Sequence, residues 1–339
     1  MRRKRGQVGG SGTSRVIPGG TPAVIASAIL IMALMFTGCG EKEPATNAVK
    51  VGYLRSDLHQ LAYYVAGEKG FFTEEGLDVK EGGVFNAGPE EMSAFSAGEL
   101  DMGYVGTAPA VTFAAQEMVD ILIVAQINAG GSSIIVRSGL EAGDVSALKG
   151  RTVAVPGHST VQDFLFRLAL TEAVLGEDEV NIITLKPPEM IGALASGQID
   201  AFVAWEPYPQ MAVAQNVGWV LENSSEIWPH HPCCVLVVDR GFAERNPDTV
   251  RRFVAAHVKA TEYINENPLE SADMGHLFTG QDSEAVEAAM KNIEFVHELN
   301  VKGLQRYVEF LMEIGVVKVE SAKSFCDTLI DQQFLPREN

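Results

Sequence analysis

Short, continuously apolar runs rich in β-branched residues recur along the chain and alternate with amphipathic helical patterns. Clear examples are 121–125, 134–136, 152–155 and 235–238, most of them next to Asp, Gly or Pro. Continuous apolar runs are typical of strands buried on both faces of a sheet, whereas half-exposed strands alternate. Between such runs, 58–66 shows the i, i+3, i+4 spacing of a helix with one buried face. The alternation predicts an α/β protein with helices on both faces of its sheets.

Two segments of the chain share one pattern. Residues 91–101 and 190–200, offset by 99, each contain a helical segment, a Gly at its C-terminal end and a strand that opens with Asp. One interpretation is two similar α/β lobes, and the other is the ordinary pattern of any β–α unit. Two lobes would enclose a cleft in which ligands bind at the carboxyl ends of strands. A helical tail is expected beyond them, including 249–265, 283–292 and 303–314.

Charge divides the chain into a basic head and an acidic body. The formal net charge is −18, which excludes electrostatic tracking of nucleic acid phosphates. Five basic residues and no acidic residue precede the apolar run 23–37, an order that indicates an export signal. The run closes on Phe36-Thr37-Gly38-Cys39, which resembles a lipobox and predicts a lipid on Cys39. We expect a signal peptide at 1–38, a tether at 39–48 and an extracytoplasmic body; an uncleaved anchor helix is the alternative.

Polar residues stand where predicted strands pass into predicted helices. Arg55 and Ser56 follow the strand 49–54, and an Arg at the carboxyl edge of a strand can clamp an oxyanion with two hydrogen bonds. Gly106 allows close backbone approach, and Thr107 is expected to cap a helix whose free N–H groups face the cleft. A solvated surface charge and an ordinary helix cap are the alternatives for these sites.

A second predicted helix start lies at His158, Ser159 and Thr160. Ser159 with Gln162 fits a capping box, which would leave the neighbouring polar residues around the free N–H groups of the helix. Such a helix start favours negative charge. The pattern predicts an anion-binding position in the second half of the chain.

The segment Trp228-Pro229-His230-His231-Pro232-Cys233-Cys234 carries two His and two Cys. It lacks the C-x₂₋₄-C and H-x₃₋₅-H spacings that wrap a tetrahedral metal, and adjacent strand residues point to opposite faces. We therefore expect no metal and predict buried free thiols, with a vicinal disulfide as the alternative. Cys326 stands alone, so no disulfide framework is predicted.

Six stretches together resemble the SsuA/TauA/NrtA-like substrate-binding proteins of ABC importers. They are VGYL at 51–54, VAGEKGFFTEEGLDV at 65–79, AGELDMGYVGTAP at 97–109, LKGRTVAVP at 148–156, GQIDA at 197–201 and WEP at 205–207. The resemblance implies the type II periplasmic-binding-protein fold, with two α/β lobes around a hinged cleft. It implies that lobe 1 comprises 49–138 and 233–339 and that lobe 2 comprises 139–232, with hinges near Arg137–Gly139 and Pro232–Val235.

The resemblance also adds residues to the expected site. It implies that Trp205 packs on the apolar part of a solute and that Glu206 accepts from an amine or holds the opposite lobe. The complete predicted ligand-binding set is Arg55, Ser56, His59, Gly106, Thr107, Gly131, Ser132, His158, Ser159, Thr160, Trp205, Glu206 and His231.

The predicted function is the lipid-anchored solute-binding component of an ABC importer. The resemblance implies a monomer that captures a sulfonate, taurine or nitrate-like anion and delivers it to a membrane permease, without a cofactor. The sequence contains no P-loop, no G-x-S-x-G elbow and no H-E-x-x-H motif, which indicates a protein that is not an enzyme. The alternatives are an enzyme on the same fold, similar to thiamine-pyrimidine synthases or chorismate dehydratases, and a binder of a thiamine-type pyrimidine.

Overall fold

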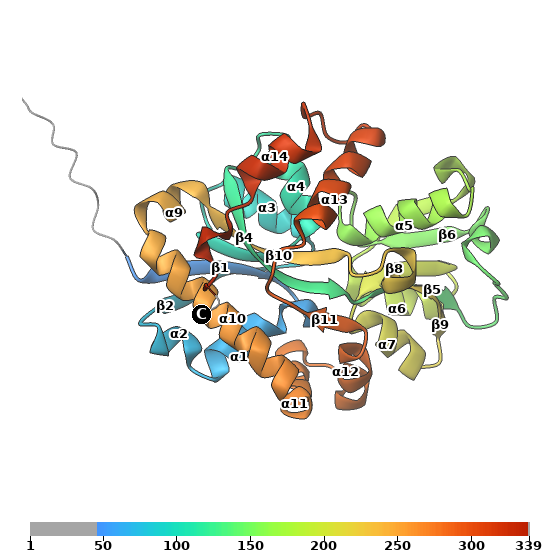
Figure 1. Ribbon diagram of the computed structural model, residues 1–339. Coiled ribbons are helices and arrows are strands. Elements are labelled where there is room, and N and C mark those ends of the chain that lie inside the picture. The colour runs from blue at the N-terminus through green and yellow to red at the C-terminus, as the bar shows by residue number, and fades with distance from the viewer. Residues whose placement is uncertain (1–45, 338–339) are drawn as a thin grey trace, which may run out of the picture. The chain divides into compact units, whose positions relative to one another are not determined.

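The computed structural model describes residues 46–337, which form two β-sheets covered by helices (Figure 1). The predicted signal peptide and Cys39 lie outside the described residues. The first sheet has six strands in the order β11-β4-β10-β3-β1-β2. Its strands are β1 (Ala48–Leu54), β2 (Asp78–Phe85), β3 (Met102–Gly106), β4 (Ile121–Gly130), β10 (Pro232–Asp239) and β11 (Ile293–Phe295).

The second sheet has five strands in the order β7-β6-β8-β5-β9. They are β5 (Ser132–Arg137), β6 (Thr152–Val155), β7 (Asn181–Thr184), β8 (Ala201–Trp205) and β9 (Gly218–Asn223). In each sheet three strands run parallel and a strand from elsewhere in the chain adds antiparallel to them: β10 beside β3, and β5 beside β8. The two sheets therefore have equivalent strand positions.

The helices cover both sheets. In the first half of the chain they are η1 (Leu58–Gln60), α1 (Leu61–Glu68), α2 (Phe71–Glu74), α3 (Gly88–Ser96), α4 (Thr107–Ala115), η2 (Val145–Leu148), α5 (Val161–Glu172), η3 (Glu177–Glu179) and α6 (Pro187–Ala195). In the second half they are α7 (Tyr208–Ala214), α8 (Ser224–Ile227), α9 (Arg240–Arg245), α10 (Pro247–Glu266), α11 (Pro268–Thr279), α12 (Ser283–Met290), α13 (Val301–Glu313), α14 (Ala322–Leu329) and η4 (Gln332–Phe334). Within residues 46–337, no helix combines the length and the apolar character that crossing a membrane requires.

The apolar patterns of the sequence correspond to the layers of the structure. Every residue of β3, β4 and β8 is buried, as expected for continuously apolar strands covered on both faces. The repeated pattern of the sequence becomes α3 with β3 in the first sheet and α6 with β8 in the second. These strands hold equivalent places, because β3 pairs with β1 as β8 pairs with β6. The sequence repeat thus marks two similar lobes.

The chain changes sheet earlier than the sequence suggested. Ser132–Arg137 pairs with β8 and β9, so this strand belongs to the second sheet. The first crossing therefore lies at Gly131 instead of the expected 137–139, because the polar Gly-Gly-Ser-Ser stretch at 130–133 separates the apolar runs of β4 and β5. The return crossing leads into β10 at Pro232, within the stretch expected for it.

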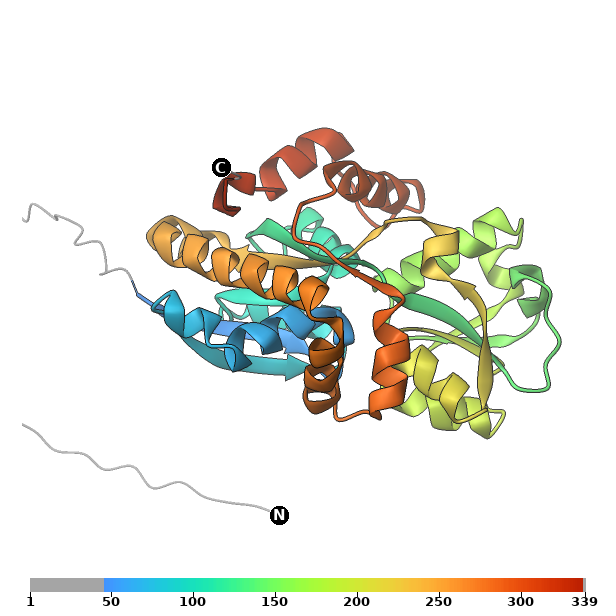
Figure 2. The same cartoon turned by 60° about the horizontal axis from the view of Figure 1, so that its bottom comes forward.

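The C-terminal helices tie the two lobes together. Helices α10 and α11 pack on α1 of the first lobe, whereas α12 lies against α7 of the second lobe (Figure 2). Phe164 of α5 packs on Tyr307 and Phe310 of α13, with ring centroids 4.2 and 4.5 Å apart. One apolar cluster consequently runs through both lobes.

Gly131 at the first crossing is conformationally and sterically constrained. Its φ is +85°, and a Cβ built there would lie 2.3 Å from Nε2 of His59 and 2.9 Å from Cγ1 of Ile293. Gly139 has a similar φ of +82°, but a Cβ there would meet nothing within 4 Å. The two glycines therefore separate backbone strain from side-chain clash.

We predict that Gly131→Ala lowers stability more than Gly139→Ala. Both substitutions strain a left-handed backbone at a cost of roughly 1 kcal/mol, and the clash at Gly131 adds roughly 1–3 kcal/mol. Urea unfolding of the two variants measures the difference. Equal destabilisation would mean that His59 and Ile293 move away without cost.

Candidate functional site

Predicted site residues from both lobes gather around a small cavity at the two crossings. The cavity has a volume of about 10 Å³, which is space for about one water molecule. It is lined by Leu54, Asp57, His59, Gly88, Gly106, Pro109, Thr160, Val161, Gln162, Trp205, Cys233 and Cys234. His59, Gly106 and the cysteines belong to the first lobe, whereas Thr160 and Trp205 belong to the second. The lobes are thus closed on one another.

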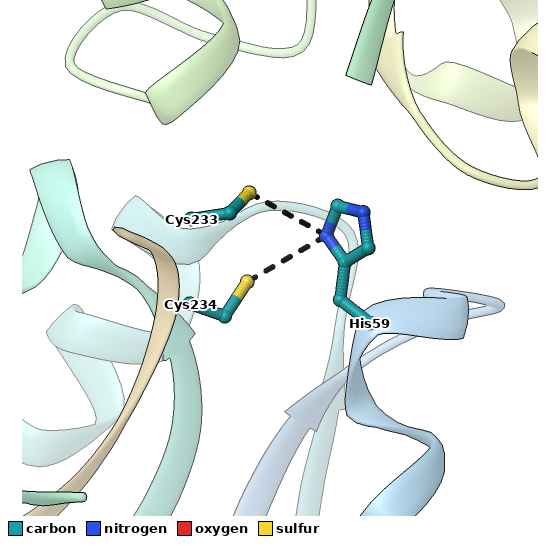
Figure 3. Close-up of side chains that lie close together, drawn as sticks. All are labelled: His59, Cys233 and Cys234. Atoms are coloured by element: carbon teal, nitrogen blue, oxygen red, sulfur yellow. Dashed lines mark hydrogen bonds between the residues drawn. The ribbon is translucent and has the colours of Figure 1, made fainter. Parts of the chain in front are cut away.

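His59 lies at the centre of this site and is completely buried. It is in η1, directly after β1, where Asp57 caps the helix by accepting from the His59 backbone N–H at 3.0 Å. The ring Nε2–H donates to the carbonyl oxygen of Gly131 at 2.7 Å. This hydrogen bond leaves Nδ1 facing two sulfur atoms, Sγ of Cys233 at 3.6 Å and Sγ of Cys234 at 3.7 Å (Figure 3).

The two cysteines face the same His because β10 is irregular at this point. Pro232 is opposite Ala129 and Cys234 is opposite Asn128, so Cys233 is an extra residue in the pairing with β4. A bulge of this kind disturbs the regular alternation of side chains and re-aims the inserted residue. The expectation that adjacent side chains point to opposite faces is therefore wrong here. Both sulfur atoms can approach one metal ion, although the sequence spacing predicted none.

The charge state of the cluster follows from burial and proximity. Burial alone would raise the pKa of the Cys233 thiol, but its hydrogen bond with Cys234 and the charge of His59 hold it well below its usual range. Burial would lower the pKa of His59, but the neighbouring charges of Cys233 and Asp57 raise it to about 9. Cys234 has a pKa well above its usual range because of its hydrogen bond with Cys233 and its burial. The lower pKa of Cys233 and the higher pKa of Cys234 and His59 favour a proton on the ring and on Cys234 over a proton on Cys233.

Glu206 connects the second lobe to the first crossing and is also completely buried. Its backbone N–H donates to the Gly131 carbonyl oxygen at 2.9 Å, and its own carbonyl oxygen accepts from Leu58 N–H at 3.1 Å. Its side-chain Oε1 accepts from Nδ2 of Asn292 at 2.8 Å. Burial raises the pKa of Glu206 to about 7 although these hydrogen bonds favour its charged form. From the end of β8, Glu206 thus makes hydrogen bonds with Leu58 and Asn292 on the first-lobe side.

Thr107 and Trp205 each bury a polar atom without a protein partner. Oγ1 of Thr107 and Nε1 of Trp205 have no hydrogen-bond partner among the described residues. The N-cap of α4 is Gly106 and not Thr107 as expected, because Thr107 is already the first residue of the helix. Trp205 lines the cavity, and Thr107 lies between the lining residues Gly106 and Pro109. Buried polar atoms without partners are rare in folded proteins, and beside a cavity a ligand or an ordered water can supply the missing partner.

His231 belongs to an aromatic cluster beside the site. Its ring lies near Trp228, and Nδ1 is 3.4 Å from the hydroxyl of Tyr307. Burial lowers the pKa of His231 to about 4, so the ring is neutral at physiological pH. Its Nε2 has no partner among the described residues.

The second-lobe helix start is arranged differently from the expected capping box. Thr160, and not Ser159, is the N-cap of α5, because its Oγ1 accepts from Asp163 N–H at 3.2 Å. Ser159 instead adopts a left-handed φ of +63° and donates its N–H to the Asp163 carboxylate at 3.1 Å. Gln162 leaves the box entirely and donates from Nε2 to Oγ of Ser132 at 2.9 Å. The capping role moves by one residue because Asp163 supplies the acceptor that Gln162 was expected to supply.

Four of the predicted residues, described next, lie away from the central cavity. His158 and Ser159 line a separate hollow of about 190 Å³ between α5 and α13, together with Arg167. Arg55 is exposed. Ser56 donates from Oγ to the carbonyl oxygen of Thr279 at 3.0 Å. Among the described residues that line the central cavity, none is Lys or Arg, so the expected Arg55 clamp stays a prediction.

Several residues outside the predicted set complete the site. Asp57 and Gln162 line the cavity, and Asn292 reaches Glu206 from beyond α12. Asp57 stands two positions before His59 and could have been included with the first loop. Asn292 lies 86 residues from Glu206, and no local pattern connects the two.

Comparison with known proteins agrees with this architecture. The sequence profile of the NMT1-like family matches residues 42–277. A Bacillus subtilis protein named for binding aliphatic sulfonates is 30% identical over 282 residues, covering 80% of this chain and 83% of the relative. A Brucella abortus protein named as a binding protein is 32% identical over 249 residues, covering 72% and 75%.

Solved structures share the fold at lower sequence identity. The alkanesulfonate-binding protein SsuA of Xanthomonas axonopodis matches with a TM-score of 0.73 and 18% identity, covering 84% of this chain and 98% of that chain. The periplasmic nitrate-binding protein NrtA of Synechocystis matches with a TM-score of 0.74 and 15% identity, covering 86% and 88%. The periplasmic-binding-protein fold predicted from the sequence is therefore confirmed.

Two α/β lobes closed around a buried polar site define this protein as a two-lobed binding protein with the periplasmic-binding-protein fold. The length and identity of the matches carry the assignment further. The chain belongs to the NMT1-like family. The resemblance to the SsuA/TauA/NrtA-like proteins that the sequence indicated is likewise confirmed.

We predict that Glu206→Gln flattens the pH dependence of stability. The raised pKa means that the folded state holds a proton that the unfolded state has lost above about pH 4.5, so the free energy of unfolding falls as pH rises from about 4.5 to 7. The change from this group is roughly 3 kcal/mol. Urea unfolding across this pH range measures it. Glu99→Gln, the same charge change at an exposed position, is the control and should keep the wild-type slope. An unchanged slope in Glu206→Gln would contradict the buried, protonated state.

Proposed function

We propose that this protein is the solute-binding component of an ABC importer, which captures a small molecule between its lobes and passes it to a membrane permease. The observation that carries the proposal is the buried site at both crossings, built by residues of both lobes. A ligand that contacts both lobes stabilises the closed state, because only there are both sets of contacts made. The names of the Bacillus relative and of the two structural neighbours support sulfonates and nitrate as solutes to test.

The site itself favours a compact solute. The closed cavity is small, and its lining offers the Asp57 carboxylate, the His59 ring and the polar groups of Thr160 and Gln162. His59 is the one basic side chain among the described residues that line the cavity, and its pKa is raised to about 9. A small monoanion or a neutral polar molecule suits this arrangement better than a dianion.

A thermal-shift screen of sulfonates, taurine, nitrate, bicarbonate and pyrimidines tests the function. A captured solute raises the melting temperature with concentration, and a receptor returns it chemically unchanged. Conversion of the solute would instead favour an enzyme on this fold. Failure of every solute class to shift the melting temperature would contradict the receptor role.

We predict that Thr107→Val weakens binding of the solute found in this screen by about tenfold, because one hydrogen bond to the ligand is lost. The same change raises the stability of the unliganded protein by about 1 kcal/mol, because a buried hydroxyl without a partner is removed. Calorimetric titration and urea unfolding measure the two effects.

Thr112→Val is the matched control for this prediction. Thr112 also lies in α4 with a buried Oγ1 that has no partner among the described residues, but it lies beyond the lining residues Gly106 and Pro109, whereas Thr107 lies between them. Its substitution should stabilise the protein to a similar extent and leave solute affinity unchanged. Equal affinity in both variants would remove Thr107 from the site.

We further propose that the body works outside the cytoplasm, held to the membrane by a lipid on Cys39, and that it binds as a monomer. The basic head, the apolar run 23–37 and the following Gly38-Cys39 support this location. A single lipid chain gives only weak attachment, so stable anchoring requires a second chain or a second contact with the membrane.

We predict that Cys39→Ser moves the protein from the membrane fraction to the soluble extracytoplasmic fraction. Cys326→Ser removes a thiol elsewhere and should leave the protein in the membrane. Fractionation followed by immunoblotting measures the distribution. If Cys39→Ser stays in the membrane, the apolar run is an uncleaved anchor.

A further inference from the structure

Three potential metal ligands lie close together at the interlobe site. Nδ1 of His59 and the sulfur atoms of Cys233 and Cys234 all lie within 4.8 Å of one another (Figure 3). The carboxylate of Asp57 lies 3.4 Å from the same Nδ1. All of these side chains are buried. We propose that His59, Cys233 and Cys234 form a binding site for a soft, thiophilic metal ion of the Zn²⁺, Cd²⁺ and Cu⁺ class.

The distances fit metal coordination. Bond lengths of about 2.3 Å to sulfur and about 2.0 Å to nitrogen, at a tetrahedral angle, separate the two ligand atoms by roughly 3.5 Å. The observed separations from Nδ1 are 3.6 Å to Cys233 and 3.7 Å to Cys234. Only small side-chain movements are needed to place one ion between the three atoms.

The orientation of His59 also matches that of a metal ligand. A ligating His almost always donates its second ring N–H to a carbonyl or a carboxylate, which fixes the ring and leaves the other nitrogen free for the metal. Nε2–H of His59 makes this bond to the Gly131 carbonyl oxygen at 2.7 Å. A metal ion would bind at Nδ1, which faces the two sulfur atoms.

The donor set selects the class of ion. Two sulfur ligands and one imidazole favour soft or borderline ions over Mg²⁺ and Ca²⁺, which prefer oxygen. Metal binding requires both sulfur ligands as thiolates, so it releases thiol protons and its affinity falls as the pH is lowered.

The position of the site indicates how the ion is held. All three ligands belong to the first lobe, and the adjoining cavity is closed on its other side by Thr160, Val161 and Trp205 of the second lobe. Three protein ligands leave a fourth tetrahedral position open toward this cavity, as in sites that accept an exchangeable ligand. This step rests on the proposed function: the ion is captured between the lobes as part of the solute.

Cd²⁺ titration of the full-length chain carrying Cys39→Ser, in detergent and under a non-thiol reductant, tests the site. We expect one Cd²⁺ per protein, with the ultraviolet charge-transfer absorption of thiolate–cadmium bonds, and no competition from excess Mg²⁺. Cys233→Ser and Cys234→Ser should each weaken binding by at least about 100-fold, the upper end of losses seen for groups that only support metal ligands.

Cys326→Ser is the matched control, because Cys326 is also a buried free thiol but lies in α14, away from the site. It should bind Cd²⁺ like the parent chain. The charge-transfer absorption of the parent chain is an independent measurement should a serine variant fail to fold. Absence of this absorption at saturating Cd²⁺, or unchanged affinity in folded Cys233→Ser and Cys234→Ser, would overturn the proposal.

The metal titration and the solute screen fail independently. Cd²⁺ binding is measured on the purified protein without a permease, so it can succeed even if no solute class shifts the melting temperature. If the protein binds Cd²⁺ through the cysteines but binds no organic solute or anion, the metal site is supported and the proposed capture of those solutes is contradicted. A protein that binds a sulfonate but not Cd²⁺ keeps the receptor function and loses the metal site.

Discussion

The site depends on two hydrogen bonds that share one acceptor, the carbonyl oxygen of Gly131. It accepts from Nε2–H of His59 in the first lobe and from the backbone N–H of Glu206 in the second lobe. Both donors are completely buried, so neither hydrogen bond is replaced by water if the oxygen moves. The carbonyl can take this position because Gly131 tolerates a left-handed backbone and no Cβ occupies the space of the His59 ring. One backbone atom at the first crossing therefore fixes the His59 ring and links it to Glu206 of the opposite lobe.

The closed arrangement gathers ionisable groups that water would normally separate. Asp57, His59, Glu206 and Cys233 are all buried near the crossings, and burial raises the pKa of Asp57 and of Glu206 to about 7. Perturbed pKa values of this kind cluster at functional sites, because such sites bury ionisable side chains that are otherwise found on the protein surface. Opening of the lobes would rehydrate these groups. The cost of burying these groups opposes closure, so contacts made only in the closed arrangement must offset it.

The cysteine pair shows how a local irregularity changes chemistry. In a regular strand Cys233 and Cys234 would face opposite sides and could not share a neighbour. The extra residue in the pairing of β10 with β4 lets both sulfurs approach Nδ1 of His59. Spacing rules for metal sites describe ligands that one short segment provides, and here the third ligand lies 174 residues away along the chain. Metal motifs in sequences of this class are therefore incomplete until the fold brings the segments together.

The sequence by itself determined the α/β class, the two similar lobes and the general place of the site. These properties are local, because burial on both faces gives continuous apolar strands and a repeated β–α pattern produces equivalent strands such as β3 and β8. The return crossing at Pro232 and the helix α10 follow from equally local signals. The tertiary structure alone decided the first crossing at Gly131, the cap at Thr160, the partnership of Asn292 with Glu206 and the approach of both cysteines to His59. Each of these depends on strand register and on contacts between distant segments, and register is set by the packing of whole sheets, which no single stretch of sequence encodes.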